Sequence, residues 1–546
     1  MSARRSSPLL ALVLAIAAAG CAGGSRALPA ARQAGGAARV RVSFVMHWPA
    51  RAQGIHRRPS FVSPSAVSVV VEVNPDAASA GPVTFANAPA GGGASTVAID
   101  APPGADVFVI SLYDAPQTAG ETSANGNELG RVRLTQAIAA NATNTLSATV
   151  IGTVAAIRIG PLPNQSNVLS IAGSSPPGFE LVGRAPATFA VAPLDADGNA
   201  IVQPDAPPAI SLAPNVRSTG VIAVTPVPGT TDQYTVQAVA PNTTTYPTSL
   251  TASATDANGN IATSSVLADA TSAVYVAYAN GGSPAVARFD AHGTPQTLPA
   301  GAFPGLGNPV ALAYDADDRE IFVADAGLGK VLAFAENGAP VASFAAPAVA
   351  GVNGVAYDPH NGNVYASGSA GVTVFSPNGG APNGSVPASF AVPSAQGIAF
   401  VATSATSALN RIAVGSAAAT PALRFYSENG SAAGSVTLSA APIAVAYAAP
   451  AAVGQVPQTT AQLYVTTAAG VVARDAFGGA VASAADPGGP FGIAVDPNLN
   501  APQVAERGAN ALAGYLDDLS AVDPIRSFST PASLGLTQPQ GVCHVF

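Results

Sequence analysis

The feature that most constrains the fold is a short apolar motif that recurs six times in the second half of the chain. Each copy reads Gly or Ala, then Leu, Val or Ile, then Ala or Cys. The copies are Ala311–Asp315, Gly354–Asp358, Gly397–Phe400, Ala444–Tyr447, Gly492–Asp496 and Gly541–His544. Their first residues lie 43, 43, 47, 48 and 49 positions apart. A period of 40 to 50 residues, with several short strands in each unit, predicts a β-propeller.

Two units follow a more specific pattern. Residues 310–338 contain three strand-like segments and end in an Asn337–Gly338 turn, after which a fourth strand is predicted at Val341–Phe344. Residues 310–338 and 354–379 resemble the NHL repeat, and the later units match it more loosely. The resemblance implies that residues 271–546 form a six-bladed propeller of the NHL type.

The two ends of this region are expected to complete one blade together. The first unit, with strands at Ala273–Tyr278 and Ala285–Phe289, has no opening copy of the motif, whereas the last copy, Gly541–Phe546, has no strands after it. We therefore expect Gly541–Phe546 to be the innermost strand of the first blade. Such a closure removes the open sheet edges that promote aggregation.

Residues 39–152 and 153–270 are predicted to form two β-sandwich domains. In the first, apolar side chains alternate along Val42, Phe44 and Met46, which is the period of a strand with one buried face. Further strands are expected in both domains, separated by Pro and Gly clusters, and one of them is Thr145–Ile151. The fold class is therefore all-β, with two sandwiches followed by the propeller.

Two turns in the second domain have the same composition, Asp195–Asn199 and Asp256–Asn260. They resemble the turns of bacterial immunoglobulin-like surface modules, so the sandwiches are expected to be Ig-like. Asp195 and Asp197 have the alternate spacing of calcium ligands, but a calcium loop needs a later bidentate acid, and residues 200–204 contain none. We interpret these segments as hairpin turns, in which Asp-Gly and Asn-Gly supply positive φ angles.

The N-terminus has the organisation of an export signal. Arg4 and Arg5 precede an apolar stretch, Pro8–Ala19, that is too short to span a bilayer. It ends in Ala18-Ala19-Gly20-Cys21 and resembles a bacterial lipoprotein signal, although Leu is the usual residue where Ala18 stands. The resemblance implies cleavage before Cys21 and its lipidation, which places residues 1–21 in the signal and anchors the protein to the cell envelope (outer membrane, periplasm or cell surface). The alternative is an ordinary secretory signal in which Cys21 has no role.

Charge is distributed unevenly. The chain has 22 basic and 30 acidic residues, for a net charge of -8, which argues against a nucleic-acid binder. Nine arginines, two in the signal and seven between Cys21 and Glu72, precede the first acidic residue, which leaves 13 basic against 30 acidic residues and a net charge of -17 for the remainder. Residues 22–38 are rich in Ala, Gly and Arg and are expected to form a flexible tether. The basic region between Cys21 and Glu72 either binds anionic lipid headgroups or serves only as a solvated tether.

Chemistry-bearing residues are sparse. The five histidines have no metal-binding spacing, and His292 and His360 fall in predicted turns. The chain has no G-x-S-x-G nucleophile motif and no phosphate-binding motif. Cys21 and Cys543 are the only cysteines, so lipidation of Cys21 leaves Cys543 without a disulfide partner in its own chain. We expect no cofactor and no metal.

The positions just before the recurring motif are the candidate site. In six-bladed propeller lactonases, such positions supply acidic and amide ligands to a central metal. Here they are Val310, Asn353, Gln396, Ile443, Phe491 and Gln540, none of which is a carboxylate. The amides Asn353, Gln396 and Gln540 either bind a ligand at the channel mouth or satisfy backbone groups where the strands begin.

These observations predict a non-catalytic envelope lipoprotein. Its propeller would bind a protein, peptide or glycan, and its Ig-like domains would act as spacers. The alternatives are an extracellular propeller hydrolase of the lactonase type and a structural or adhesive surface protein.

Overall fold

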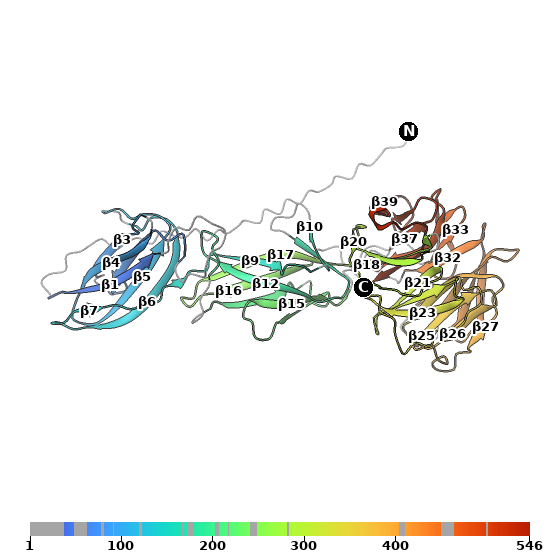
Figure 1. Cartoon of the computed structure of the whole chain (residues 1–546), viewed down its shortest axis with the longest axis horizontal. Coiled ribbons are helices and arrows are strands. Elements are labelled where there is room, and N and C mark those ends of the chain that lie inside the picture. The colour runs from blue at the N-terminus through green and yellow to red at the C-terminus, as the bar shows by residue number, and fades with distance from the viewer. Residues whose placement is uncertain are drawn as a thin grey trace, which may run out of the picture.

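The computed structural model describes residues 38–48, 63–77, 81–90, 92–119, 123–165, 167–171, 178–201, 207–216, 218–240, 248–280, 283–402, 410–448, 463–497 and 501–546. These residues form an all-β protein with one short 3-10 helix, η3 (Ala532–Leu534). Three bodies follow one another along the long axis (Figure 1). We call them the first module (residues 38–152), the middle module (153–271) and the repeat half (272–546). No helix in the described ranges is long and apolar enough to cross a membrane.

The first module consists of two sheets that share one apolar core. One sheet has the order β4-β1-β7 and the other the order β3-β2-β5-β6-β8. The predicted alternation is confirmed, because Val42, Phe44 and Met46 of β1 are buried in this core. The strands are β1 (Val40–Trp48), β2 (Ser68–Val73), β3 (Val83–Asn87), β4 (Gly93–Ala101), β5 (Gly104–Tyr113), β6 (Glu128–Ile138), β7 (Asn144–Thr145) and β8 (Ile151–Gly152).

The predicted strand at Thr145–Ile151 is wrong as one continuous element. β7 pairs with β1 in one sheet, whereas β8 pairs with β6 in the other. The chain therefore crosses from sheet to sheet between them, and it buries Leu146 and Val150 in the shared core on the way. In the sequence, apolar residues of a crossover look like those of a strand, because crossover residues and inward-facing strand residues are both buried.

The middle module also has two sheets around one core. Their orders are β10-β11-β17-β16-β13 and β14-β15-β12-β9, and Phe189, Leu181 and Leu250 are fully buried between them. The strands are β9 (Ala156–Pro161), β10 (Val168–Ile171), β11 (Gly178–Val182), β12 (Ala187–Leu194), β13 (Ala209–Pro214), β14 (Ile222–Pro226), β15 (Gln233–Ala238), β16 (Ser249–Thr255) and β17 (Ile261–Thr271).

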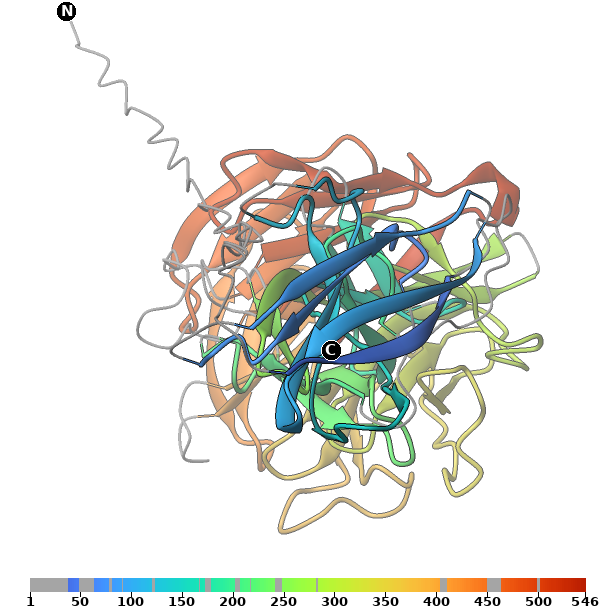
Figure 2. The same cartoon turned by 90° about the vertical axis from the view of Figure 1, so that its left-hand side faces the viewer.

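The repeat half has the organisation of a propeller, with small antiparallel sheets of three or four strands. Six such sheets lie in the described residues, in the orders β20-β19-β18-β40, β21-β22-β23, β24-β25-β26-β27, β28-β29-β30-β31, β32-β33-β34-β35 and β36-β37-β38-β39. Figure 2 views the molecule along its long axis, with the first module nearest the reader and the repeat half behind it.

The first three sheets in sequence order contain β18 (Ala273–Tyr278), β19 (Ala285–Phe289), β20 (Pro295–Gln296), β21 (Pro309–Asp315), β22 (Glu320–Asp325), β23 (Lys330–Ala335), β24 (Gly354–Asp358), β25 (Asn363–Gly368), β26 (Gly371–Phe375) and β27 (Ser389–Phe390). The other three sheets contain β28 (Ala395–Val401), β29 (Arg411–Ser416), β30 (Ala422–Ser427), β31 (Ala432–Thr437), β32 (Pro442–Tyr447), β33 (Leu463–Thr467), β34 (Gly470–Arg474), β35 (Ala480–Ala485), β36 (Pro490–Asp496), β37 (Ala501–Glu506), β38 (Ala511–Tyr515) and β39 (Val522–Ser529). The last strand, β40 (Pro539–Val545), returns to the first sheet.

The predicted pairing of the last strand with the first unit is confirmed. β40 pairs antiparallel with β18, with Val276 opposite Val542. β40 also contacts β21 on one side and β36 on the other. The remaining contacts between inner strands run β21–β24, β24–β28, β28–β32 and β32–β36.

The predicted fourth strand at Val341–Phe344 is absent. The β21-β22-β23 sheet has three strands, and only isolated bridges join Phe334 to Pro340 and Lys330 to Ala348. Phe344 is used in packing instead, with its ring 5.8 Å from that of Phe322 and 6.1 Å from that of Phe375 in the next sheet. An apolar segment can therefore cover a sheet edge without joining the hydrogen-bond ladder.

Candidate functional site

A cavity of ≈ 240 Å³ lies where the six inner strands begin. Residues from every inner strand, or from the position before it, line its wall. The lining residues are Val310, Ala311, Leu312, Asn353, Gly354, Val355, Gln396, Gly397, Ile398, Ile443, Ala444, Val445, Phe491, Gly492, Ile493, Gly541 and Val542. Asn353 and Gln396 provide the polar side chains of this otherwise apolar wall.

The recurring motif builds this wall because its small first residue lets neighbouring inner strands approach closely. A Cβ atom on Gly397 would lie 2.3 Å from the Ala444 Cα, and one on Gly492 would lie 1.9 Å from the Gln540 carbonyl oxygen. Both distances are far below van der Waals contact, so a larger residue would push two sheets apart. The glycines of the motif are therefore a packing requirement of the central cavity.

The three predicted amides have different environments. Asn353 lies on the cavity, and its Nδ2 donates to the Ala395 carbonyl oxygen of the next sheet at 3.1 Å. Gln540 is buried and is not part of the cavity wall; its Nε2 donates to Asn308 Oδ1 at 3.0 Å. Gln396 lines the cavity, and no described residue provides a hydrogen-bond partner for its side-chain amide. Asn353 and Gln540 thus join neighbouring sheets, whereas the Gln396 amide is available to a ligand.

A second set of polar residues lies near Phe491, which lines the cavity. The Arg507 guanidinium lies 5.2 Å from the centre of the Phe491 ring. Beside Arg507, burial and the neighbouring Asp486 carboxyl raise the pKa of Glu506 to about 7. The Tyr515 hydroxyl donates to Asp486 Oδ2 at 2.8 Å. Sequence reasoning missed this carboxyl pair because Asp486 precedes one strand and Glu506 ends another.

Two of the three aspartates that close inner strands, Asp315 and Asp358, have the predicted role in tight turns. Asp315 Oδ1 accepts from the backbone N–H groups of Asp317 and Asp318, and Asp358 Oδ1 accepts from that of His360. Both aspartates are fully buried, and in each the Oδ2 atom has no hydrogen-bond partner among the described residues. Asp496 accepts a hydrogen bond from the Ser272 hydroxyl at 3.2 Å.

One of these turns belongs to a cluster that the sequence did not reveal. Asp358, His360 and Glu428 each offer a ligand atom within 4.8 Å of the others. His360 Nδ1 lies 3.5 Å from Glu428 Oε2, and Asn410 Nδ2 donates to Glu428 Oε1 at 2.9 Å. Burial, assisted by the Glu428 charge, raises the pKa of Asp358 to about 7. Asp358 and His360 are two positions apart, but Glu428 comes from the next sheet, so no local spacing shows the group.

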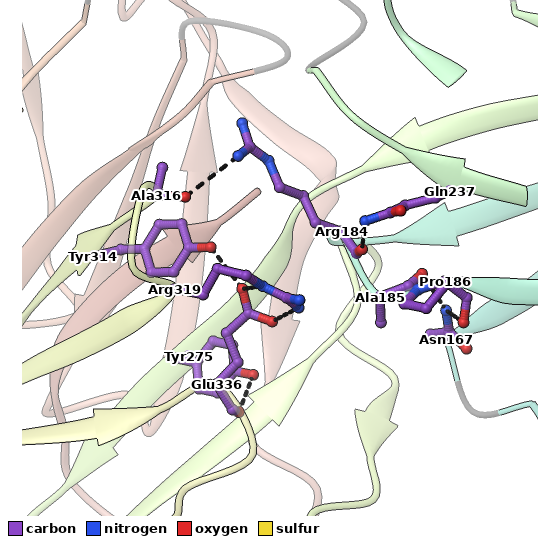
Figure 3. Close-up of polar contacts among 10 residues, drawn as sticks. All are labelled: Asn167, Arg184, Ala185, Pro186, Gln237, Tyr275, Tyr314, Ala316, Arg319 and Glu336. Atoms are coloured by element: carbon purple, nitrogen blue, oxygen red, sulfur yellow. Dashed lines mark hydrogen bonds and ion pairs between the residues drawn. The ribbon is translucent and has the colours of Figure 1, made fainter. Parts of the chain in front are cut away.

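The middle module contacts the repeat half on the side opposite the cavity. Arg184 follows β11, and its Nη1 donates to the carbonyl oxygen of Ala316, which follows β21, at 3.3 Å (Figure 3). His292 Nε2 lies 2.9 Å from Glu180 Oε1 of β11, and this hydrogen bond raises the pKa of His292. The cavity surrounds the beginnings of the inner strands and these contacts lie near their ends, so the cavity faces away from the two N-terminal modules.

Glu336 organises the repeat-half side of this junction. Its carboxylate accepts from the Tyr314 hydroxyl at 2.6 Å and from Arg319 Nε at 3.1 Å, and its carbonyl oxygen accepts from the Tyr275 hydroxyl at 2.6 Å (Figure 3). Tyr275 and Tyr314 belong to neighbouring sheets, so Glu336 links these two sheets through its hydrogen bonds. Burial raises the pKa of both tyrosines well above the usual range.

Cys21, the predicted lipidation residue, lies outside the described residues. Cys543 is a free, buried thiol in β40, and burial raises its pKa well above the usual range. Asp195 Oδ1 accepts from the backbone N–H groups of Asp197 and Asn199, which agrees with the interpretation of this segment as a turn.

No protein-family model matches the chain, and no curated protein matches it. The solved structures that show some similarity to this chain include a β-propeller domain. A nidogen/laminin complex matches at 12% identity and TM-score 0.38, covering 50% of this chain and 98% of that one. The Cps50 (Swd1) β-propeller domain of Myceliophteria thermophila matches at 12% identity and TM-score 0.30, covering 43% and 74%. A calcium-binding protein, regucalcin, from Agrobacterium tumefaciens str. C58 matches at 11% identity and TM-score 0.30, covering 41% and 75%.

Proposed function

We propose that this chain is an exported, lipid-anchored protein whose repeat half binds an envelope protein or peptide at the central cavity, without catalysing a reaction. The observation that carries the proposal is the unpartnered Gln396 amide in a mostly apolar cavity that faces away from the N-terminal modules. A wall of this kind suits an apolar side chain with a neighbouring amide, which is the chemistry of a peptide. Cys21 would carry the lipid, and residues 22–38 would be the tether.

The proposal includes a closed six-bladed propeller. Two observations support it: β40 contacts both β21 and β36, and six apolar clusters each join two neighbouring sheets. The two N-terminal modules would be Ig-like spacers, because each has two sheets of mostly antiparallel strands around one core. Together they would hold the cavity away from the membrane.

A binding comparison with matched variants tests the proposal. The mature chain would be immobilised and exposed to detergent-solubilised envelope proteins, beside the variants Ile443→Arg and Gln396→Ala. Ile443→Arg places a charge in the cavity wall, and Val216→Arg places the same charge on the middle module, where Val216 is 87% exposed. We expect a bound protein that is lost with Ile443→Arg, weakened several-fold with Gln396→Ala and retained with Val216→Arg.

Two other outcomes would overturn it. Equal capture by all four proteins would place binding outside the cavity. Turnover of lactones that requires an added divalent ion and disappears with Ile443→Arg would make the repeat half a hydrolase.

A further inference from the structure

A group of metal-ligand side chains lies on the repeat half at the opposite end of the inner strands from the central cavity. Asp358 ends β24, His360 lies in the turn to β25, and Glu428 lies in the turn between β30 and β31 of the next sheet. The three side chains therefore come from two neighbouring sheets, which are also linked by a hydrogen bond from the Tyr365 hydroxyl to the Glu428 carbonyl oxygen at 3.2 Å.

Two buried acceptor atoms at this group have no partner among the described residues. Asp358 is 0% exposed, and its Oδ2 accepts no hydrogen bond although its Oδ1 does. Asn410 is 3% exposed; its Nδ2 contacts Glu428, while the Oδ1 of the same amide is unpartnered. A buried acceptor without a donor costs on the order of 1–3 kcal/mol, and more when it is charged. The Oδ2 atoms of Asp290 and Asp315 are also unpartnered, and what distinguishes Asp358 is that His360 and Glu428 place ligand atoms within 4.8 Å of it and of each other.

The donor set and the spacing favour one class of ion. Ligand atoms around a tetrahedral ion are roughly 3.3 Å apart when the bonds are about 2.0–2.1 Å long. His360 Nδ1 and Glu428 Oε2 are already 3.5 Å apart, and the His360 side chain is 41% exposed and free to adjust. Ca²⁺ and Mg²⁺ prefer oxygen ligands alone, whereas an imidazole with carboxylates suits Zn²⁺ and its first-row neighbours.

We propose that Asp358, His360 and Glu428 bind one divalent transition-metal ion of the Zn²⁺ class, with Glu428 held in place by the hydrogen bond from the Asn410 amide nitrogen. The ion ties the sheet of β24–β27 to the sheet of β28–β31. It lies apart from the central cavity, so its role is structural and independent of ligand binding there.

The repeat half contains a natural control for this site. His292 occupies a similar turn after Asp290, and it pairs with Glu180 through both carboxylate oxygens, at 2.9 and 3.1 Å. Within the described ranges, however, only the Asp358 group brings three metal-ligand residues within 4.8 Å. His292→Gln therefore removes a histidine–glutamate pair without touching the proposed site.

Metal content and calorimetry test the proposal on the full mature chain. The protein would be stripped with chelator, titrated with Zn²⁺, and separately with Ca²⁺ and Mg²⁺, beside His360→Gln, Glu428→Gln and His292→Gln. We expect one tight Zn²⁺ per chain in the unaltered protein and in His292→Gln. We expect at least a tenfold loss of affinity in His360→Gln and Glu428→Gln, and no comparable binding of Ca²⁺ or Mg²⁺.

Thermal unfolding supplies a second readout that does not depend on the affinity fit. Zn²⁺ should raise the melting temperature of the unaltered chain and of His292→Gln, and it should leave that of His360→Gln unchanged. His360 is exposed, so its replacement is expected to fold even if a variant of buried Asp358 does not. Equal Zn²⁺ binding by His360→Gln and the unaltered chain, or no Zn²⁺ binding by either, would overturn the proposal.

Discussion

The middle module and the repeat half distribute their apolar cores differently. The middle module has one core, to which both of its sheets contribute. The repeat half has six clusters, each formed by side chains from two neighbouring sheets, such as Phe322 and Val355 in one and Tyr365 and Ile412 in another. The core of the middle module also contains Phe546, which follows β40, and one repeat-half cluster contains Val182 of β11, so the two regions share apolar contacts where they meet. A series of shared cores makes each sheet depend on its neighbours and leaves a central space where the inner strands meet.

The largest effect is expected from removing the strand on which two of the shared cores depend. Deleting Gly541–Phe546 removes Cys543 and Val545 from one cluster and Val542 from another, and it also removes Phe546 from the core of the middle module. Each fully buried aliphatic side chain contributes about 1.5–3 kcal/mol, so the loss is comparable to the whole stability of a domain. Calorimetry should show that the transition of the repeat half falls sharply or disappears. An unchanged melting temperature would contradict the role of β40.

Single core truncations compare the two regions directly. Phe189 and Phe322 are both 0% exposed, the first in the middle module and the second in a cluster between two sheets. Replacing either by Ala should cost about 3–5 kcal/mol. Phe189→Ala should lower the transition of the middle module and Phe322→Ala that of the repeat half, as followed by calorimetry. If Phe322→Ala instead lowered both transitions equally, the two regions would not be separate folding units.

A pH effect is expected in the repeat half, and it should be smaller. The carboxyl of Glu506 titrates at about 7 in the folded chain and at 4.5 when unperturbed. Between these pH values the folded chain holds the proton more firmly, so stability falls as the pH rises through this window and is constant above it. Partial exposure weakens the effect. The melting temperature of the repeat half should fall by a few degrees from pH 5 to pH 8.

The control for this effect is a pair of charge-removing variants. Glu506→Gln should reduce the pH dependence of the repeat half without abolishing it, because the pKa of Asp358 is also raised to about 7. Asp232→Asn, at an exposed position of the middle module, should leave the pH dependence unchanged. The same slope in Glu506→Gln would assign the titration to another group.

The smallest expected effect is the difference in stability between replacing Gln540 and replacing Gln396. Gln540→Ala removes a buried hydrogen bond to Asn308 and should cost about 1 kcal/mol of stability. Gln396→Ala removes an amide without a described partner, so the free energy of unfolding should change by less than about 0.5 kcal/mol. Denaturant titration measures both. A larger loss with Gln396→Ala would mean that this amide supports the fold.

The sequence was most informative in the repeat half, where each unit requires a small residue at the same position. The copies of the motif predicted every inner strand, including the pairing of β40 with β18, because close strand approach requires Gly or Ala at the same point of each unit. It was misleading at Val341–Phe344 and Thr145–Ile151, because burial alone does not show whether a segment joins a sheet.

The candidate site residues also fall into two groups, those whose position the repeat predicts and those that depend on a partner from another sheet. Asn353 and Gln396 reach the cavity as the repeat predicted, because their position in the motif fixes their place in the sheet. The role of Gln540 depends on Asn308, and the Asp358 cluster depends on Glu428. Both partners come from neighbouring sheets, and the spacing of residues within one unit carries no information about them.

The most direct test of the central claim is a photocrosslink from the cavity wall. A photoreactive amino acid would replace Gln396 in the full chain, expressed in its own envelope, and a control chain would carry it at exposed Val216 of the middle module. The account predicts a discrete crosslinked protein or peptide from position 396 that is lost when Ile443→Arg is added, and that is absent from position 216. The same products from both positions, or products only from position 216, would contradict it.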